Sequence, residues 1–229
     1  MKFHFHTTPN PFKVALMLEE LGVDYEAVPV DTRKGEQHAP DFTALNPNAK
    51  LPVIEDDDGT VVFDSNAIVL YLAQKHGRFL PDGGAATGEV LSWFFWIATG
   101  LSPYSGQAVH FTRVHKDSAY ATNRYVREVA RHYRVLDGRL AGRDWIAGDA
   151  YGVCDVAAWG WVRMAGFVME ADGGLAPYPN VQAWFDRVEA RPAVARVKEL
   201  QGRFSFKQEM DETAMRAMFP QNYEDGQPS

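Results

Sequence analysis

The chain has 229 residues, 46% of them hydrophobic, and a formal net charge of −7, which suits one large or two small globular domains. The acidic balance argues against a nucleic-acid binder, because such proteins usually present a basic face. No apolar run approaches the roughly 20 residues that span a bilayer, and the start of the chain lacks the apolar core of a secretory signal. The single cysteine, Cys154, excludes an intrachain disulfide, so we expect a cytoplasmic protein without membrane contact.

A strand, a helix and a second strand are predicted at the start of the chain. Within residues 2–7, Phe and His alternate from Phe3 to His6 before a proline-rich turn, which is typical of a strand end. In the helix that follows, we expect Asn10 as the N-cap, Pro11 in the first turn and Gly22 at the end. Residues 25–30 predict the second strand, so the two strands should be parallel with a right-handed crossover.

The next elements complete a βαβαββα unit. Residues 41–45 predict a short helix, and residues 52–55 and 61–63 predict two strands joined by the turn Asp57-Asp58-Gly59. Residues 66–76 predict a helix packed on the sheet. We therefore expect an α/β first domain over residues 1–81.

Helical patterns alone follow a segment with linker composition at residues 81–88. The predicted helices cover residues 89–100, 119–140, 156–167, 181–190 and 193–200. We therefore expect an all-α second domain over residues 89–206. Residues 207–229 are polar, and we expect this tail to be loosely held.

A proline lies at the mouth of one predicted strand, in the run Lys50-Leu51-Pro52-Val53-Ile54. Proline donates no ladder hydrogen bond, so it suits the first residue of a strand, and an X-Pro bond takes the cis form at low cost. The backbone of Leu51 would then be open to another peptide. Twelve residues after Pro52, Asp64-Ser65 begins a predicted helix with a carboxylate and a hydroxyl group. Together these residues suggest a site for a small charged peptide.

These features in this order resemble the glutathione S-transferase superfamily over residues 1–205. Further motifs are similar to the bacterial Nu class and its fungal Ure2p-like relatives: Thr8-Pro9-Asn10, Lys34-Gly35-Glu36-Gln37, Asn46-Pro47-Asn48, Trp93 to Trp96, and Gly106-Gln107 with His110-Phe111. The resemblance implies a thioredoxin-like first domain, glutathione as co-substrate without a metal, a homodimer, and marked disulfide-bond reductase activity.

The catalytic turn implied by the resemblance contains Thr8 and Asn10. A free thiol titrates near 8.5, so only a few per cent of it is thiolate at neutral pH. A hydroxyl, an amide NH₂ and helix N–H groups all stabilise an anionic sulfur. Residues 1–24 contain no Tyr or Cys, two residues that many superfamily members use here. The alternative interpretation is that Asn10 only caps the helix.

The resemblance also implies the residues that hold the tripeptide. Leu51, before Pro52, would pair with the cysteinyl backbone, as in a short β-augmentation. Asp64 would bind the γ-glutamyl amine, although the family often has the longer Glu there, and Ser65 would bind the α-carboxylate. The remaining implied ligands of glutathione carboxylates are Gln37, Lys50 and Arg131, the last in its own or the facing subunit. The alternatives are a plain helix start at Asp64, a solvated charge at Lys50, and a solvated or salt-bridged arginine at Arg131.

Other conspicuous side chains are interpreted as structural. The aromatic residues are more typical of core or dimer contacts than of a substrate wall: Trp93, Phe94, Trp96, Tyr104 and Phe111. His110 is expected to be structural, and Cys154 an inert core residue. His4 and His6 share a strand face without further ligands, so no zinc site is expected. Asp155 predicts the N3 carboxylate of a capping box that lacks a hydroxyl at Gly152.

Two functions remain open from the sequence. The first is a homodimeric, glutathione-dependent enzyme that acts on disulfides, peroxides or electrophiles. The second is a non-catalytic interaction or regulatory protein on the same scaffold. The retained polar residues Thr8, Asn10 and Asp64 favour the enzyme. A chloride-channel-like membrane form is disfavoured, because its candidate apolar segment, residues 93–101, is too short.

Overall fold

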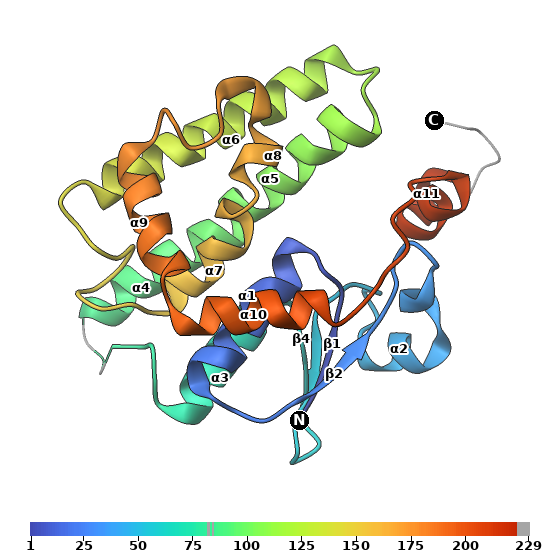
Figure 1. Ribbon diagram of the computed structural model, residues 1–229, viewed down its shortest axis with the longest axis horizontal. Helices are drawn as coiled ribbons and strands as arrows, with labels where there is room; N and C mark the ends of the chain where they lie inside the picture. The colour runs from blue at the N-terminus through green and yellow to red at the C-terminus, as the bar shows by residue number, and fades with distance from the viewer. Residues whose placement is uncertain (82, 84, 224–229) are drawn as a thin grey trace.

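The computed structural model describes residues 1–81, 83 and 85–223 (Figure 1). Its sheet has the strand order β2-β1-β3-β4. The strands are β1 (Lys2–Phe5), β2 (Glu26–Pro29), β3 (Val53–Glu55) and β4 (Val61–Phe63). Strand β1 pairs in parallel with β2, while β3 is antiparallel to both β1 and β4. The four predicted strands and the predicted parallel pair are confirmed.

The helices of this N-terminal part are α1 (Pro9–Leu21), the 3-10 turn η1 (Glu36–His38), α2 (Pro40–Leu45) and α3 (Ser65–His76). Helix α1 is buried at every residue from Pro11 to Leu18, because it contacts α3 on one side and α7 and α10 of the helical part on others. A helix covered on all sides is apolar all round. Gly22 ends α1 with a φ of 69°, as predicted.

The start of α1 differs from the prediction. Thr8, rather than Asn10, is the N-cap residue, and Pro9 occupies the first helical position. Proline suits this position because its missing N–H would have no helical partner there. Asn10 therefore lies inside the first turn, where its side chain is not used for capping.

The helical part consists of α4 (Ala85–Trp96), α5 (Ser102–Val109), α6 (Ala119–Leu140), α7 (Val153–Val162), α8 (Ala165–Val168), α9 (Pro179–Glu189) and α10 (Pro192–Gly202). The prediction for α6 is confirmed at both ends. The predicted linker is wrong at residues 85–88, where α4 already begins, and Asp82 and Gly84 lie outside the described residues. The helix predicted over 156–167 begins earlier and is broken between α7 and α8.

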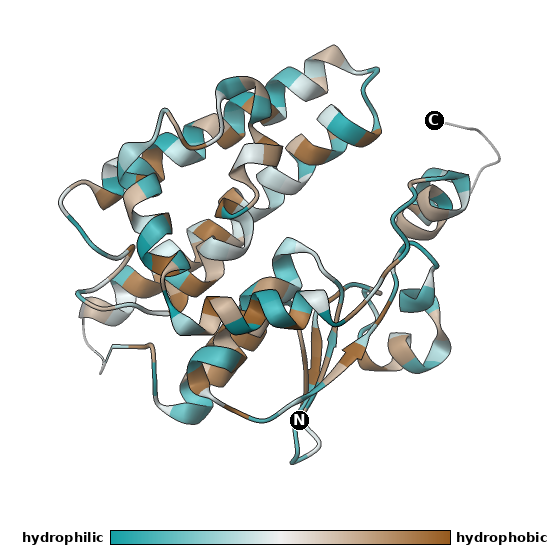
Figure 2. Cartoon of the chain, in the orientation of Figure 1, coloured by the Kyte–Doolittle hydropathy of each residue, from teal (hydrophilic) through white to brown (hydrophobic). Residues whose placement is uncertain are grey.

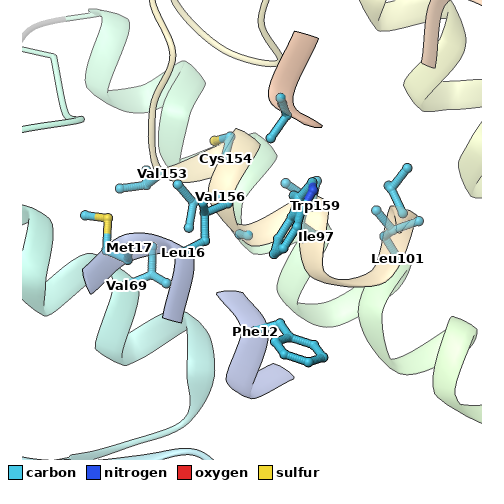
Figure 3. Close-up of a cluster of buried hydrophobic side chains, with 14 of the residues drawn as sticks. Phe12, Leu16, Met17, Val69, Ile97, Leu101, Val153, Cys154, Val156 and Trp159 are labelled. Atoms are coloured by element: carbon cyan, nitrogen blue, oxygen red, sulfur yellow. The ribbon is translucent and has the colours of Figure 1, made fainter. Parts of the chain in front are cut away.

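Helix α7 lies at the centre of the molecule. Side chains of α1, α3, the turn after α4, and α7 converge there, among them Phe12, Val69, Ile97 and Trp159 (Figure 3). In Figure 2 the strands are largely brown, whereas the outer helix α6 alternates teal and brown along its length. One apolar core thus joins the sheet part to the helical part.

A glycine allows α7 to approach the start of α1. A Cβ atom at Gly160 would lie 2.4 Å from the Pro9 carbonyl oxygen and 2.6 Å from the Lys13 Cγ atom. Any side chain at Gly160 would force the two helices apart. Asp155 starts α7 as predicted: its Oδ2 accepts from Gly152 N, and its Oδ1 accepts from Ile146 N and Trp184 Nε1.

The segment after α10 returns to the sheet part (Figure 1). The Lys207 N–H donates to Asp31 Oδ2 at 2.7 Å, and the ring of Phe219, beyond α11 (Glu212–Met218), lies 4.9 Å from that of His110. The expectation of a loosely held tail is therefore wrong for residues 207–219. Residues 224–229 lie outside the described part of the tail. Among the described residues, none of the helices has the length and apolar character needed to cross a bilayer.

Candidate active site

Strand register brings three predicted site segments to one end of the sheet. His4 pairs with Val53, and β1 then runs on toward Thr8. Val53 also pairs with Phe63, the residue before Asp64. Because β3 is antiparallel to both neighbours, Pro52 lies between the end of β1 and the end of β4. The catalytic turn, the proline corner and the start of α3 are therefore neighbours.

Asn10 is oriented by a tryptophan from the helical part. Its Oδ1 accepts a hydrogen bond of 3.0 Å from the indole Nε1 of Trp161, on α7. An indole N–H can only donate, so the oxygen of the amide must face Trp161. The NH₂ group of Asn10 is then turned away from the indole, and it makes no hydrogen bond within the described part of the chain. Asn10 can therefore donate to an anion.

Thr8 places a second donor beside Asn10. Its backbone is extended, with φ −125° and ψ 163°, and its side chain makes no capping hydrogen bond. The residue is exposed at the N-terminus of a helix of 13 residues, whose aligned peptide dipoles favour negative charge. The hydroxyl of Thr8, the amide of Asn10 and the helix end form an environment suited to a thiolate.

The Leu51-Pro52 peptide bond is cis, as the sequence allowed. Asn46 holds the loop before it: Asn46 Nδ2 donates to the Lys50 carbonyl at 2.7 Å, and Asn46 Oδ1 accepts from Asn48 N at 3.0 Å. Leu51 lies just before the first paired residue of β3, Val53. The corner therefore lies beyond the paired part of the inner strand β3, where the backbone of Leu51 can pair with an extended peptide.

Asp64 combines capping with exposure. Its Oδ1 accepts from Asn66 N at 2.9 Å and from Ala67 N at 3.1 Å, so the plain helix-start interpretation is confirmed for this oxygen. The residue is exposed, with a φ of 72°, and the second oxygen accepts no hydrogen bond among the described residues. Ser65 follows it and is 6% exposed.

Gln37 is already engaged by the tail. Its Nε2 donates to the Ala217 carbonyl of α11 at 2.8 Å, and the His38 Nε2 lies 2.8 Å from the same oxygen. Gln37 is 4% exposed, and its Oε1 has no partner within the described residues. Lys50, by contrast, is exposed and forms no ion pair in the part of the chain that is described.

Arg131 is separate from these segments. It lies on α6, which packs on α5 and α9, and its guanidinium is paired with Glu128 at 2.6 Å. This pairing holds the pKa of the Glu128 carboxyl below its ordinary value. No contact of Arg131 joins it to Thr8, Pro52 or Asp64 among the described residues.

Lys13 was not singled out by the sequence analysis. It is 1% exposed, and its Nζ lies 3.0 Å from Ser102 Oγ, 3.3 Å from Asn66 Oδ1 and 3.5 Å from Ser65 Oγ. Burial lowers the pKa of Lys13 to about 7, and Asp64 opposes that shift. A lysine within the otherwise apolar run of residues 11–18 was the available signal. Trp161 had a weaker signal, since a Trp in a helix usually indicates core.

His4 in β1 and His6, just after β1, lie in different surroundings. His4 Nε2 lies 2.7 Å from Glu55 Oε1, while the ring of His6 lies 4.1 Å from that of Phe206. Burial lowers the pKa of His6. Across residues 1–81, 83 and 85–223, no group of three or more His, Cys, Asp or Glu side chains could hold a metal ion.

Family models for the N-terminal and C-terminal domains of glutathione S-transferases match residues 7–75 and 97–192. The chain belongs to the glutathione S-transferase family. This transferase is 40% identical over 200 residues to the disulfide-bond oxidoreductase YfcG of Escherichia coli (strain K12), covering 84% of this chain and 92% of that protein. It is 38% identical over 206 residues to YghU of the same organism, also a disulfide-bond oxidoreductase. The match covers 82% of this chain and 70% of YghU.

Solved structures agree with this assignment. A glutathione transferase from Burkholderia graminis, crystallised with two glutathione molecules per subunit, has a TM-score of 0.80 and 35% identity and covers 89% of each chain. URE2P8 from Phanerochaete chrysosporium, crystallised with oxidized glutathione, has a TM-score of 0.82 and 30% identity, covering 88% of this chain and 95% of that one. The predicted resemblance to the Nu and Ure2p-like group is confirmed. The predicted fold class, a thioredoxin-like α/β domain followed by an all-helical domain, is also confirmed.

Proposed function

We propose that this transferase binds glutathione where the catalytic turn, the proline corner and the start of α3 meet, and activates its thiol. The observation that carries this proposal is the orientation of Asn10, whose amide oxygen accepts from Trp161 and whose NH₂ is available. Thr8 would donate a second hydrogen bond. Lowering a thiol pKa by one unit requires about 1.4 kcal/mol of preferential stabilisation of the thiolate, which two such donors and a helix N-terminus can supply.

The remaining residues would hold the tripeptide. The Leu51 backbone would pair with the cysteinyl residue, the uncommitted oxygen of Asp64 would accept from the γ-glutamyl amine, and Ser65 would bind the α-carboxylate. Lys50 is free of ion pairs among the described residues, which suits the glycyl carboxylate. The NH₂ of Gln37 contacts both the Ala217 carbonyl and, at 3.1 Å, His38 Nε2, so Gln37 would contribute there by exchanging its bond to Ala217 for one to the ligand.

The reaction we propose first is disulfide reduction. The glutathione thiolate attacks one sulfur of a disulfide, forms a mixed disulfide and releases a thiolate that takes up a proton. A second glutathione thiolate then attacks the mixed disulfide and gives oxidized glutathione and the second thiol. The protein needs no cysteine for this cycle, and Cys154 is unsuited to it because it is 2% exposed and burial raises its thiol pKa. Two relatives are named for disulfide-bond oxidoreduction, and one related structure holds two glutathione molecules per subunit.

We also propose a homodimer, in which Arg131 reaches a carboxylate of glutathione in its own or the facing subunit. The separation of Arg131 from the other site residues within one chain supports the facing subunit. Binding of that carboxylate would compete with, or add to, the existing pair with Glu128. Light scattering on the purified protein tests the dimer directly.

The function is tested with purified protein on glutathione resin and with a small disulfide as substrate. We expect the protein to be retained, to be eluted by free glutathione, and to couple oxidation of glutathione to reduction of the disulfide. Protein that is neither retained nor active would support the alternative, a non-catalytic member of the family.

A further inference from the structure

Lys13 is a buried lysine whose hydrogen-bond partners are all uncharged groups. Its side chain comes from α1, and its three hydrogen-bond acceptors, Ser65, Asn66 and Ser102, come from α3 and α5. Within the described residues, no carboxylate oxygen lies within 4.0 Å of its Nζ. Among the described residues, the charged group that acts on it is Asp64, the exposed N-cap of α3, while α5 and α7 present Ser102 and Gly160.

This environment is unfavourable for an ammonium group. Removing a charge from water costs several kcal/mol after relaxation, and neutral oxygen atoms recover only part of that loss. A Met would fill the same volume without the penalty. The position of Nζ therefore calls for an explanation beyond packing. An anion bound beside it would provide one, because the anion would stabilise the protonated form that burial disfavours.

The geometry indicates where that negative charge arrives. Gly160 of α7 confines the lysine stem, since even a Cβ there would come within 2.6 Å of Lys13 Cγ. The Nζ atom lies 3.5 Å from the hydroxyl oxygen of Ser65, the first residue of a helix of 12 residues. Asp64 Oδ1 already accepts from the N–H groups of Asn66 and Ala67. A carboxylate bound by the hydroxyl and the backbone N–H of Ser65 would lie just beyond the hydroxyl.

We propose that Lys13 supplies the positive charge for the α-carboxylate of the γ-glutamyl group, and that it acts through the hydroxyl of Ser65. This inference rests on the proposed glutathione site. The Ser65 hydroxyl accepts a hydrogen bond from Lys13 and donates its own hydrogen to the carboxylate. Lys13 is a positioning residue, because it does not touch the ligand. At any pH at which Lys13 is neutral in the unliganded protein, binding of the carboxylate makes Lys13 take up a proton from solvent.

Proton uptake distinguishes this role from a structural one. The probe is S-methylglutathione, which keeps both carboxylates and the amine but has no thiol to titrate. Calorimetric titration at pH 7.5, in phosphate and in Tris, gives the number of protons exchanged on binding. We expect the natural protein to take up about half a proton or more, given a Lys13 pKa of about 7.

Either of two changes to this titration should abolish the proton uptake. The first is a ligand without the charge: the S-methylated 4-aminobutyryl analogue, which lacks only the α-carboxylate. The second is Lys13→Met, which should weaken binding of S-methylglutathione about tenfold or more but binding of the analogue less than twofold. Lys198→Met, which removes an exposed lysine paired with Glu189, should leave affinity and uptake unchanged.

Each outcome decides the inference. Equal affinity and equal uptake in Lys13→Met and the natural protein would overturn it, even in an active enzyme. Uptake that persists with the analogue would also overturn it. If Lys13→Met does not fold, the difference in proton uptake between the two ligands on the natural protein still tests the inference. If the natural protein binds neither ligand, the proposed glutathione site fails and the inference fails with it.

Discussion

Trp161 donates its indole N–H to the amide oxygen of Asn10 at 3.0 Å, across 151 positions of the chain. The bond joins α7 of the helical part to the first turn of α1. It exists because Gly160, the neighbour of Trp161, lets α7 approach the Pro9 carbonyl closely. The helical part thus orients the amide that we expect to stabilise the glutathione thiolate.

Trp161→Phe keeps most of the ring and removes the N–H. The Asn10 amide can then rotate, so we expect the pKa of bound glutathione to rise by about one unit and kcat/KM at neutral pH to fall about tenfold. The thiolate ultraviolet absorbance and the pH profile of kcat/KM measure both effects. Trp159→Phe is the matched control: it removes an indole N–H donated to Glu189 from the same helix and should leave the pH profile unchanged. An unchanged profile in Trp161→Phe would contradict the orienting role.

Asn10→Ala removes the donor itself. We expect glutathione affinity within about twofold of the natural protein, and turnover at least tenfold slower, because the donor acts mainly on the anion. Binding by calorimetry and turnover with a small disulfide separate the two effects. The double variant with Asn10→Ala and Trp161→Phe should turn over no more slowly than Asn10→Ala alone, because the indole acts only through the amide. Unchanged turnover in Asn10→Ala would remove Asn10 from the mechanism.

We expect the tail and glutathione to compete for Gln37. Gln37 Nε2 donates to the Ala217 carbonyl, so transfer of that donor to the glycyl carboxylate would loosen α11. We expect glutathione to speed amide hydrogen exchange in residues 211–219 several-fold. The control ligand is γ-glutamylcysteine, which lacks the glycine and should have no such effect. Exchange that is unchanged with glutathione would indicate that Gln37 stays with the tail.

Lys13 makes stability depend on pH. Burial lowers its pKa from 10.5 to about 7 in the folded protein, so between these values the unfolded chain binds more protons. Stability therefore rises with pH across this window and is lowest below about pH 7. Relative to Lys13→Met, the free energy of unfolding of the unliganded natural protein should rise by about 1 kcal/mol per pH unit from pH 7 to 9. Urea titrations at several pH values measure it, and an equal slope in both proteins would contradict the burial of a neutral lysine.

Local signals in the sequence determined the order of elements and the outline of the site. Alternating residues predicted β1, a proline at a strand mouth predicted the corner at Pro52, and Asp64 marked the start of α3. These predictions succeeded because strand pairing, helix capping and proline geometry depend on residues close in sequence. The order of these elements with the family motifs was sufficient to identify the family.

Tertiary packing decided the features that complete the site. The first turn of α1 begins at Pro9 rather than after Asn10, and Asn10 is oriented by Trp161 instead of capping the helix. Lys13 is buried because α3, α5 and α7 close around it, and Gln37 donates to a tail that its composition predicted to be loose. Each of these depends on contacts between residues far apart in the chain. No local pattern encodes such contacts, because close packing arises only when all the elements are in place.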